Sequence, residues 1–280
     1  MIYCSIMFFD FIRYCSIIGL FIPKKIDSRI DCILGRLFMR QMVLTAFIFA
    51  TCLIADEAYD IIKRLDENFR GKDIYMLINM KIVSMGHERV MKMQSYSKGS
   101  NKSFVKITYP PKDEGITFLS LDREMWQYVP KIERIIKIPP SMMLQKWMGS
   151  DITNDDMVKQ SSIVEDYTPK ILNRDGSIVT IELTPKENAP VVWGKIVTNI
   201  DTDTYTSNKD VFYDEEGKEI RFFIYDKVMK IGDYYIPTYW RVQSSNKKDE
   251  FSEIVLQEVK YDTKISDEYF SKSALTRFSR

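Results

Sequence analysis

Only a few side chains in this 280-residue chain have the types and spacing that catalysis or metal binding requires. The chain contains a single histidine, His87, which argues against a His-based catalytic triad and against a multi-histidine metal site. His87 follows Met85-Gly86, a sequence typical of a hairpin turn. We therefore expect a solvated turn histidine and not a catalytic base.

Acidic residues near two aromatic rings offer a second kind of chemistry. Asp122, Glu124 and Glu133 lie close in sequence to Trp126 and Tyr128. Paired carboxylates beside aromatic side chains are typical of a secreted glycosidase. Acidic residues also flank many exposed strands, and a solvated surface explains these three more simply.

A second acidic group could hold a cation. Asp151, Asn154, Asp155 and Asp156 carry the oxygen ligands that calcium prefers, although their spacing is not that of an EF-hand loop. The same stretch has the pattern of a helix start, with Thr153 as N-cap and acidic residues in the first turn. We favour helix capping.

Cysteine position and overall charge exclude further classes of protein. The four cysteines all lie in the first fifth of the chain, at Cys4, Cys15, Cys32 and Cys52. The rest of the chain therefore has no disulfide framework, cysteine nucleophile or zinc knuckle. A formal net charge of +1 gives no basic footprint for nucleic acid. We expect no cofactor, no bound metal, no nucleic-acid partner and no enzymatic activity.

The first 55 residues have the pattern of an export leader. Arg40 precedes an uncharged apolar run over residues 43–55, which is too short for a transmembrane helix. These features predict a signal peptide over residues 39–55, with cleavage after Ala55. Cys52 offers a lipidation site, but the residues before it form a poor lipobox.

Residues 1–38 have two interpretations. They are rich in Ile and Phe but contain Asp10 and Arg13, both of which are costly at the centre of a bilayer. One interpretation is an extra membrane anchor. The other is an upstream extension from a misassigned translation start, with the true start at Met39 or Met42. We favour the misassigned start.

Hydrophobic periodicity predicts one mainly β domain over residues 56–280. Apolar residues at helical spacing predict a helix over Ala58–Phe69, after which the period changes to two and predicts a strand over Ile74–Ile82. Further apolar runs predict the strands Val90–Tyr96, Phe104–Tyr109, Ile116–Leu121, Met125–Val129, Arg134–Ile138, Ile178–Leu183, Val191–Ile200, Val211–Tyr213, Ile220–Tyr225, Tyr239–Gln243 and Glu253–Tyr261. Many short strands separated by turns are typical of an antiparallel sandwich or barrel.

One predicted helix interrupts the strands. Residues 141–148 fit a short amphipathic helix with Leu144, Trp147 and Met148 on one face. Methionines concentrate around it, between Met76 and Met157. Methionine recurs at surfaces that accept varied apolar ligands, but it also fills irregular gaps in a core, which is the simpler explanation.

Several longer stretches are similar to one known family. They are Tyr96–Gly99, Met125–Lys131, Ile138–Met143, Trp147–Asp156, Ile181–Lys186 and Val192–Lys195. These stretches resemble the outer-membrane lipoprotein-sorting protein family, relatives of the Lol-system carriers. The resemblance covers nearly all of residues 56–280, whereas the leader before Met39 departs from the family pattern.

The resemblance implies a fold and a role. The implied fold is mainly β with a few helices: a half-open antiparallel β-barrel, LolA/LolB-like, around a hydrophobic cavity with a helical lid. In better-known relatives the cavity holds the acyl chains of lipoproteins in transit between the inner and outer membranes. No catalytic residues are known for the family, so none can be assigned here.

The residues expected to line the cavity and its lid are aromatic or methionine-rich. They are Trp126, Tyr128, Met142, Met143, Leu144, Trp147, Met148 and Trp193. Packing in the core is the alternative for the three tryptophans and the tyrosine. Lys131, Arg134 and Lys137 alternate with apolar neighbours, which indicates a solvated strand face or a contact with anionic headgroups.

These expectations combine into one function with two alternatives. We expect a monomeric periplasmic carrier that binds acyl chains of lipoproteins or other lipids and moves them toward the outer membrane. Its partners would be an inner-membrane transporter and an outer-membrane acceptor. The alternatives are a secreted hydrolase with acidic catalytic residues and a lipid-binding accessory of an envelope transporter.

Overall fold

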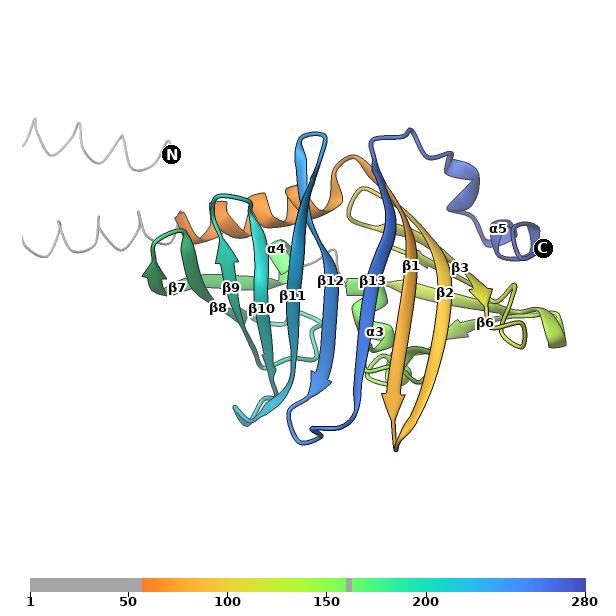
Figure 1. Ribbon diagram of the computed structural model, residues 1–280, viewed down its shortest axis with the longest axis horizontal. Helices are drawn as coiled ribbons and strands as arrows, with labels where there is room; N and C mark the ends of the chain where they lie inside the picture. Colours follow the sequence, from red (N-terminus) through yellow and green to blue (C-terminus); the bar gives the residue numbers. More distant parts are fainter. Residues whose placement is uncertain (1–56, 160–162) are drawn as a thin grey trace, which may run out of the picture. The chain divides into compact units, whose positions relative to one another are not determined.

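The computed structural model describes residues 57–159 and 163–280 (Figure 1). The predicted signal peptide, its cleavage site and Cys52 lie outside the described residues. Within the described part of the chain, no helix combines the length and the apolar character needed to cross a bilayer.

Thirteen antiparallel strands form a single curved sheet (Figure 1). They are β1 (Asp73–Ser84), β2 (His87–Lys98), β3 (Lys102–Tyr109), β4 (Thr117–Leu121), β5 (Glu124–Val129), β6 (Arg134–Ile138), β7 (Tyr167–Asp175), β8 (Ile178–Pro185), β9 (Lys195–Asp201), β10 (Thr206–Tyr213), β11 (Glu219–Ile231), β12 (Tyr234–Ser244) and β13 (Phe251–Tyr261). Their order is β6-β5-β4-β3-β2-β1-β13-β12-β11-β10-β9-β8-β7, so β6 and β7 are free edges. The sheet is therefore open, and the sandwich alternative is wrong.

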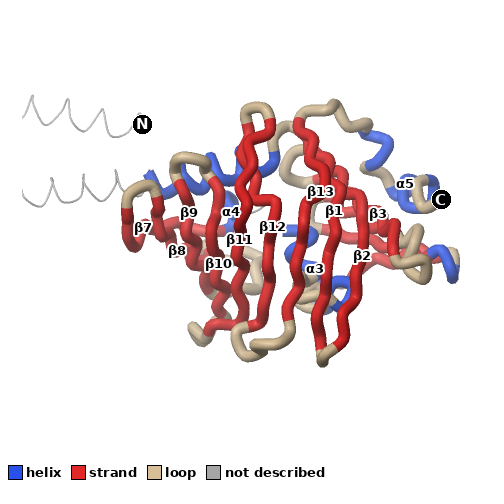
Figure 2. Tube along the Cα trace, viewed as in Figure 1, coloured by secondary structure: helices blue, strands red, loops and turns tan. Residues whose placement is uncertain are grey.

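Helices cover the two faces of this sheet unequally. The helix of residues 57–70 lies behind the central strands together with α3 (Asn154–Lys159) and α4 (Ile163–Asp166), as Figures 1 and 2 show. Helix α5 (Lys272–Arg277) covers the other face, where its Leu275 packs with Phe104 of β3. Short 3₁₀ turns occupy Pro130–Ile132, Pro140–Met142, Trp147–Gly149 and Asp267–Tyr269.

The two-residue period of the strands explains how both faces are buried. In β1, Ile74, Met76 and Ile78 belong to the core cluster on the face that carries α3. Tyr75 points to the opposite face and packs against the cluster under α5. Successive side chains of a strand point to opposite faces, so the alternation read in the sequence separates the two clusters.

The sequence located most of the elements correctly. The helix of residues 57–70 and the predicted strands are confirmed, with longer bounds for β10, β11 and β12. Strand β7 was not predicted, because only Tyr167 among its nine residues is buried and the apolar alternation is weak. The strand predicted from Val191 starts only at Lys195.

The predicted amphipathic helix over residues 141–148 is wrong. Two 3₁₀ turns occur there instead, and Met148 inside the second turn has a left-handed backbone (φ 51°). The carbonyl of Met142 accepts a hydrogen bond from Asn154 Nδ2 at 2.9 Å, and that of Met143 accepts one from the Asp155 N–H at 2.8 Å. These carbonyls bond to a distant segment, so they are not used for a helical i→i+4 ladder.

Gly194 allows a close approach of two chain segments beside β9. Its N–H donates to the Tyr213 carbonyl at 3.0 Å, and a Cβ at this position would lie 2.7 Å from the Asp214 carbonyl carbon. The atoms it would meet belong to backbone, which yields less readily than a flexible side chain.

We expect Gly194→Ala to lower the free energy of unfolding by about 3 kcal/mol, the upper range for overpacking. Urea denaturation monitored by circular dichroism would measure the loss. Gly99→Ala is the control, because its left-handed backbone meets only one side-chain atom at 3.9 Å and should cost only about 1 kcal/mol. Equal losses in the two variants would contradict the clash.

Candidate functional site

A pocket of about 260 Å³ lies on the face of the sheet that carries the helix of residues 57–70 and α3. Side chains of β1, β2, β3 and β9 to β13 line it, together with the helix of residues 57–70 and α3. Most of these side chains are aliphatic, aromatic or methionine. Such a mainly apolar concave site with a few polar groups is typical of small-ligand binding.

The helix of residues 57–70 closes one side of the pocket. Its Ile61 and Ile62 are buried against the β8–β9 part of the sheet, while Leu65 and Phe69 line the pocket. Leu65 and Phe69 are four residues apart, so they lie on the same side of the helix. The Phe69 ring packs 5.9 Å from the Trp240 ring, measured between centroids.

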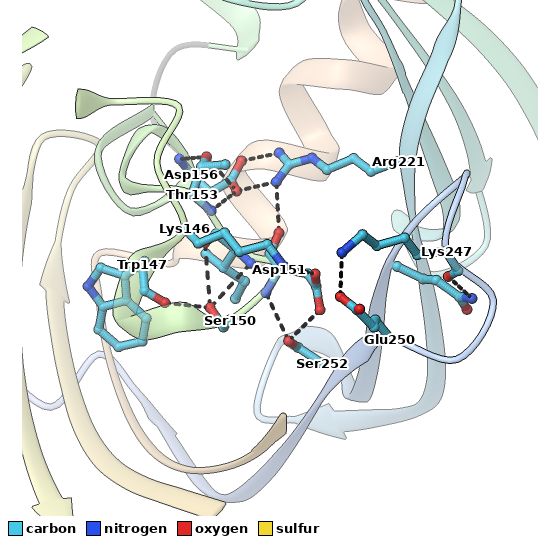
Figure 3. A network of polar contacts seen from close by, with 12 residues as sticks. Lys146, Trp147, Ser150, Asp151, Thr153, Asp156, Arg221, Lys247, Glu250 and Ser252 are labelled. Carbon is cyan, nitrogen blue, oxygen red and sulfur yellow. Dashed lines mark hydrogen bonds and ion pairs between the residues drawn. The ribbon is translucent and has the colours of Figure 1, made fainter. Parts of the chain in front are cut away.

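A partly buried ion pair joins α3 to the sheet beside the pocket (Figure 3). Arg221 of β11 donates from Nη1 to Asp156 Oδ2 at 2.6 Å and from Nη2 to Asp156 Oδ1. The same Nη1 donates to the Asp151 carbonyl at 3.2 Å. Arg221 is only 3% exposed, so its charge depends on these acceptors for compensation.

Aromatic rings surround the same guanidinium. Its carbon lies 4.5 Å from the ring centroid of Trp193, 4.6 Å from that of Phe212 and 5.2 Å from that of Phe223. A cation close to ring faces is attracted by the aromatic quadrupole. The packing also explains why Arg221 can occupy an otherwise apolar position in the strand.

The segment before α3 has a second attachment to the sheet. Asp151 accepts a hydrogen bond from Ser252 Oγ of β13 at 2.9 Å, and its N–H donates to the same Oγ at 2.9 Å (Figure 3). Lys146 Nζ also donates to Asp151, at 2.8 Å. Residues 146–156 are thus tied to β11 through Arg221 and to β13 through Ser252.

The predicted helix cap is confirmed. The Asp156 N–H donates to Thr153 Oγ1 at 3.2 Å, and the Thr153 N–H donates to Asp156 Oδ2 at 2.7 Å. This reciprocal pair has the geometry of a capping box. Asp156 therefore caps α3 and also binds Arg221. In the described residues, no group of three or more potential metal ligands occurs.

Replacing Arg221 by methionine leaves the Asp156 carboxylate without its buried cation. We expect Arg221→Met to lower the free energy of unfolding by about 3–5 kcal/mol. The double variant Arg221→Met/Asp156→Asn should recover part of this loss, because it also removes the unpaired negative charge of Asp156. Denaturant unfolding would measure both changes.

The exposed pair Lys247–Glu250 provides the control, with Nζ and Oε2 2.7 Å apart. Lys247→Met should cost less than about 1 kcal/mol. If the double variant is no more stable than Arg221→Met alone, the loss comes from packing against the rings and not from the unpaired carboxylate.

Asp210 is a half-buried carboxyl at the β10–β11 side of the pocket. It accepts hydrogen bonds from Ser207 Oγ at 2.6 Å and from the Tyr225 hydroxyl at 2.8 Å. Thr198 lies behind Ser207, with the two hydroxyl oxygens 3.1 Å apart. Burial raises the pKa of Asp210, and the three hydroxyl side chains lower it only in part. Burial together with nearby Asp210 also raises the pKa of Tyr225.

The raised pKa of Asp210 determines whether the stability of the fold rises or falls with pH. Between the ordinary pKa of aspartate and the raised value, the folded protein binds more protons than the unfolded chain, so stability falls as pH rises. Asp210→Asn keeps an acceptor and removes the titration. We expect the unfolding free energy of the variant, relative to the parent chain, to increase between pH 4 and pH 8. A difference that stays flat in urea titrations over this range would contradict the raised pKa.

The structure separates the residues predicted to line the cavity. Trp147 and Trp193 line the pocket. Met142, Met143 and Met148 are partly buried and pack against the core cluster of the same face. The remaining three lie elsewhere: Leu144 is 55% exposed, and Trp126 and Tyr128 belong to the cluster under α5 on the opposite face.

The residues considered for acidic catalysis are on the surface. Asp122 accepts a hydrogen bond from Asn101 Nδ2 at 2.7 Å, and Glu124 pairs with Lys137. Asp122, Glu124 and Glu133 are exposed and do not line the pocket. His87 is also exposed, directly after the β1–β2 turn.

The basic residues on and before β6 are solvated. Lys131, Arg134 and Lys137 are all exposed. β6 is an edge strand, and four of its five residues are exposed. The predicted solvent exposure is therefore confirmed for all three side chains, but only Arg134 and Lys137 lie on a strand, because Lys131 belongs to the 3₁₀ turn Pro130–Ile132.

Three solved structures share this fold. A DUF1329 family protein from Desulfovibrio piger is 24% identical, with a TM-score of 0.73 over 79% of this chain and 99% of that one. A putative outer membrane lipoprotein-sorting protein domain from Vibrio parahaemolyticus is 18% identical, with a TM-score of 0.71 over 80% and 100%. A LolA superfamily protein from Nitrosomonas europaea is 22% identical, with a TM-score of 0.66 over 78% and 98%.

The open antiparallel sheet and its short helices thus define a protein of LolA-like, outer-membrane lipoprotein-sorting fold. A family model described as "uncharacterized protein" matches residues 99–277, which is more than half of the chain, and the chain belongs to that family. No curated protein sequence matches it.

Proposed function

We propose that this protein is a periplasmic carrier that binds acyl chains of lipoproteins or other lipids in the pocket and moves them toward the outer membrane. It catalyses no reaction in this role. The apolar pocket between the sheet and the helix of residues 57–70 is the observation that carries the proposal. The lipoprotein-sorting fold of the solved relatives supports it.

The size of the pocket suits one hydrocarbon chain. Its volume of about 260 Å³ is close to the lower end of the roughly 300–1,000 Å³ common for ligand sites. Burying each CH₂ group contributes roughly 0.8 kcal/mol, so a chain of about twelve carbons gains about 10 kcal/mol before ordering costs. Because a membrane offers the chain the same apolar surroundings, the net affinity is moderate, which suits a carrier that must release its cargo.

Residues 146–158 form the lid in this proposal. Trp147, Ile152 and Met157 from this segment line the pocket. The segment packs on the sheet through Trp147, Ile152 and Val158. Its polar attachments, through Arg221 and Ser252, can break and re-form without unfolding the sheet. Opening of this segment would admit a chain from a membrane, and closing would shield it from water.

The proposal extends to location and partners. In this proposal the leader directs export of the protein, which acts as a monomer. It receives its cargo from an inner-membrane donor and delivers it to an outer-membrane acceptor. The hydrolase alternative has no comparable support, because Asp122, Glu124 and Glu133 are exposed and lie outside the pocket lining.

Filling the pocket tests the proposal. Met157 lines the pocket from α3 and is only partly buried, so Met157→Trp adds volume there without replacing a fully buried core residue. We expect the affinity for the neutral fluorescent probe N-phenyl-1-naphthylamine to fall about tenfold, equivalent to about 1.4 kcal/mol. Fluorescence titration of the full chain would measure it.

Met229→Trp is the matched control, since Met229 of β11 is 54% exposed. Its probe affinity should equal that of the parent chain. Equal probe binding by all three proteins, or no binding by the parent chain, would contradict a carrier role for this pocket.

A further inference from the structure

Building on the proposed function, we propose that the pocket selects amphiphiles with a cationic amine group, and that Asp210 is the residue that binds the amine. The hydrocarbon part of such a ligand would lie along the apolar wall. The amine would lie at the β10–β11 side, beside Asp210 and Tyr225.

The charges around the pocket support a cationic ligand. The acidic residues of its lining are Asp66, Asp155, Asp156 and Asp210, and no lysine, arginine or histidine of the described residues lines it. A fatty-acid carboxylate or a phosphate buried here would meet acidic side chains, and no cationic side chain of the described lining could pair with it. Anionic ligands are therefore disfavoured, because the desolvation cost of a buried anion would not be offset by a cationic side chain of the lining.

The carboxylates are not equivalent. Asp66 accepts a hydrogen bond from Arg70 Nε at 2.8 Å, and Asp156 is paired with Arg221. Asp210, in contrast, is held by the hydroxyls of Ser207 and Tyr225, and no ion pair joins it to a cation of the described residues. Of these three carboxylates, Asp210 is the one to which a ligand cation would bring a counter-charge.

Aromatic rings beside Asp210 provide a second recognition element. Tyr225 donates to Asp210, and its ring stacks at 5.9 Å on Phe223 and meets Trp240 edge-on at 6.1 Å. All three rings line the pocket. An ammonium group next to a carboxylate and close to ring faces gains both charge-assisted hydrogen bonds and cation–π attraction.

The raised pKa of Asp210 is consistent with this arrangement. Burial raises the pKa of Asp210, which favours its neutral form when no cation is present. An ammonium group would stabilise the charged form, and the pocket would then hold a neutral pair. A buried charge that is paired and hydrogen-bonded avoids most of the desolvation cost of a lone ion.

Three probes with the same twelve-carbon alkyl chain separate the contribution of the headgroup to binding from that of the hydrocarbon. Dodecylammonium, dodecanol and dodecanoate, each below its micelle concentration, would compete with bound N-phenyl-1-naphthylamine on the full chain at neutral pH and physiological salt. We expect dodecylammonium to displace the probe at a concentration about tenfold lower than dodecanoate, with dodecanol between them. Asp210→Asn should reduce this preference to near unity and leave dodecanol binding unchanged.

Asp226→Asn is the control, because it removes the same charge from an exposed position of β11. It should keep the parent preference. Equal displacement by all three probes, or stronger displacement by dodecanoate, would overturn the amine selectivity but leave the carrier function standing. A preference that survives Asp210→Asn would overturn the assignment to Asp210. No displacement by any of the probes would instead overturn the proposed function itself.

Discussion

The pairing of β1 with β13 is the constraint on which the rest of the structure depends. Every other neighbouring pair in the sheet is consecutive along the chain, so without this ladder there would be two separate meanders. Its register runs from Ile74 opposite Tyr261 to Val83 opposite Phe251. Buried Asp73 fixes the junction by accepting hydrogen bonds from the backbone N–H groups of Thr263 and Lys264 at 2.8 and 3.0 Å. The pocket wall spans this ladder, with Met76 and Met80 on one side of it and Ile254 on the other. The pocket can therefore exist only when both ends of the domain have come together.

A second level of organisation follows from polar contacts laid over this apolar wall. The segment of residues 146–158 has too few residues to form a core of its own. It is placed by hydrogen bonds to strands that lie far away in sequence, through Arg221 on β11 and Ser252 on β13. The hydrophobic effect is non-directional, so apolar contacts alone would leave the segment's position loosely specified. The buried polar groups give it one position, which is how an apolar pocket obtains a defined shape.

Sequence periodicity predicted the strands because burial of one or both faces of a sheet leaves a strong two-residue pattern, as in β1 and β2. It failed over residues 141–148, where hydrogen bonds from Asn154 and Asp155 decide the backbone and no local pattern records them. Within the site, the size and apolar character of Trp147 and Trp193 indicate their place, whereas Asp210 and Arg221 escape a sequence-based prediction because charged residues in a strand usually face solvent. A usable signal for Arg221 exists: it is in phase with Phe223 and Tyr225, which share its face of β11.

The methionines of the pocket affect the range of ligand shapes that it can accept. Met76, Met80, Met93 and Met157 all line it, and each is an unbranched side chain with three rotatable bonds. A wall of this kind can change its contour while it keeps the same polarity, whereas branched aliphatic residues would present one rigid outline. The same thioethers are open to oxidation, and each sulfoxide would place a polar, chiral group in the wall. The apolar character of the pocket is thus a property of the chemical state of four sulfur atoms as well as of the sequence.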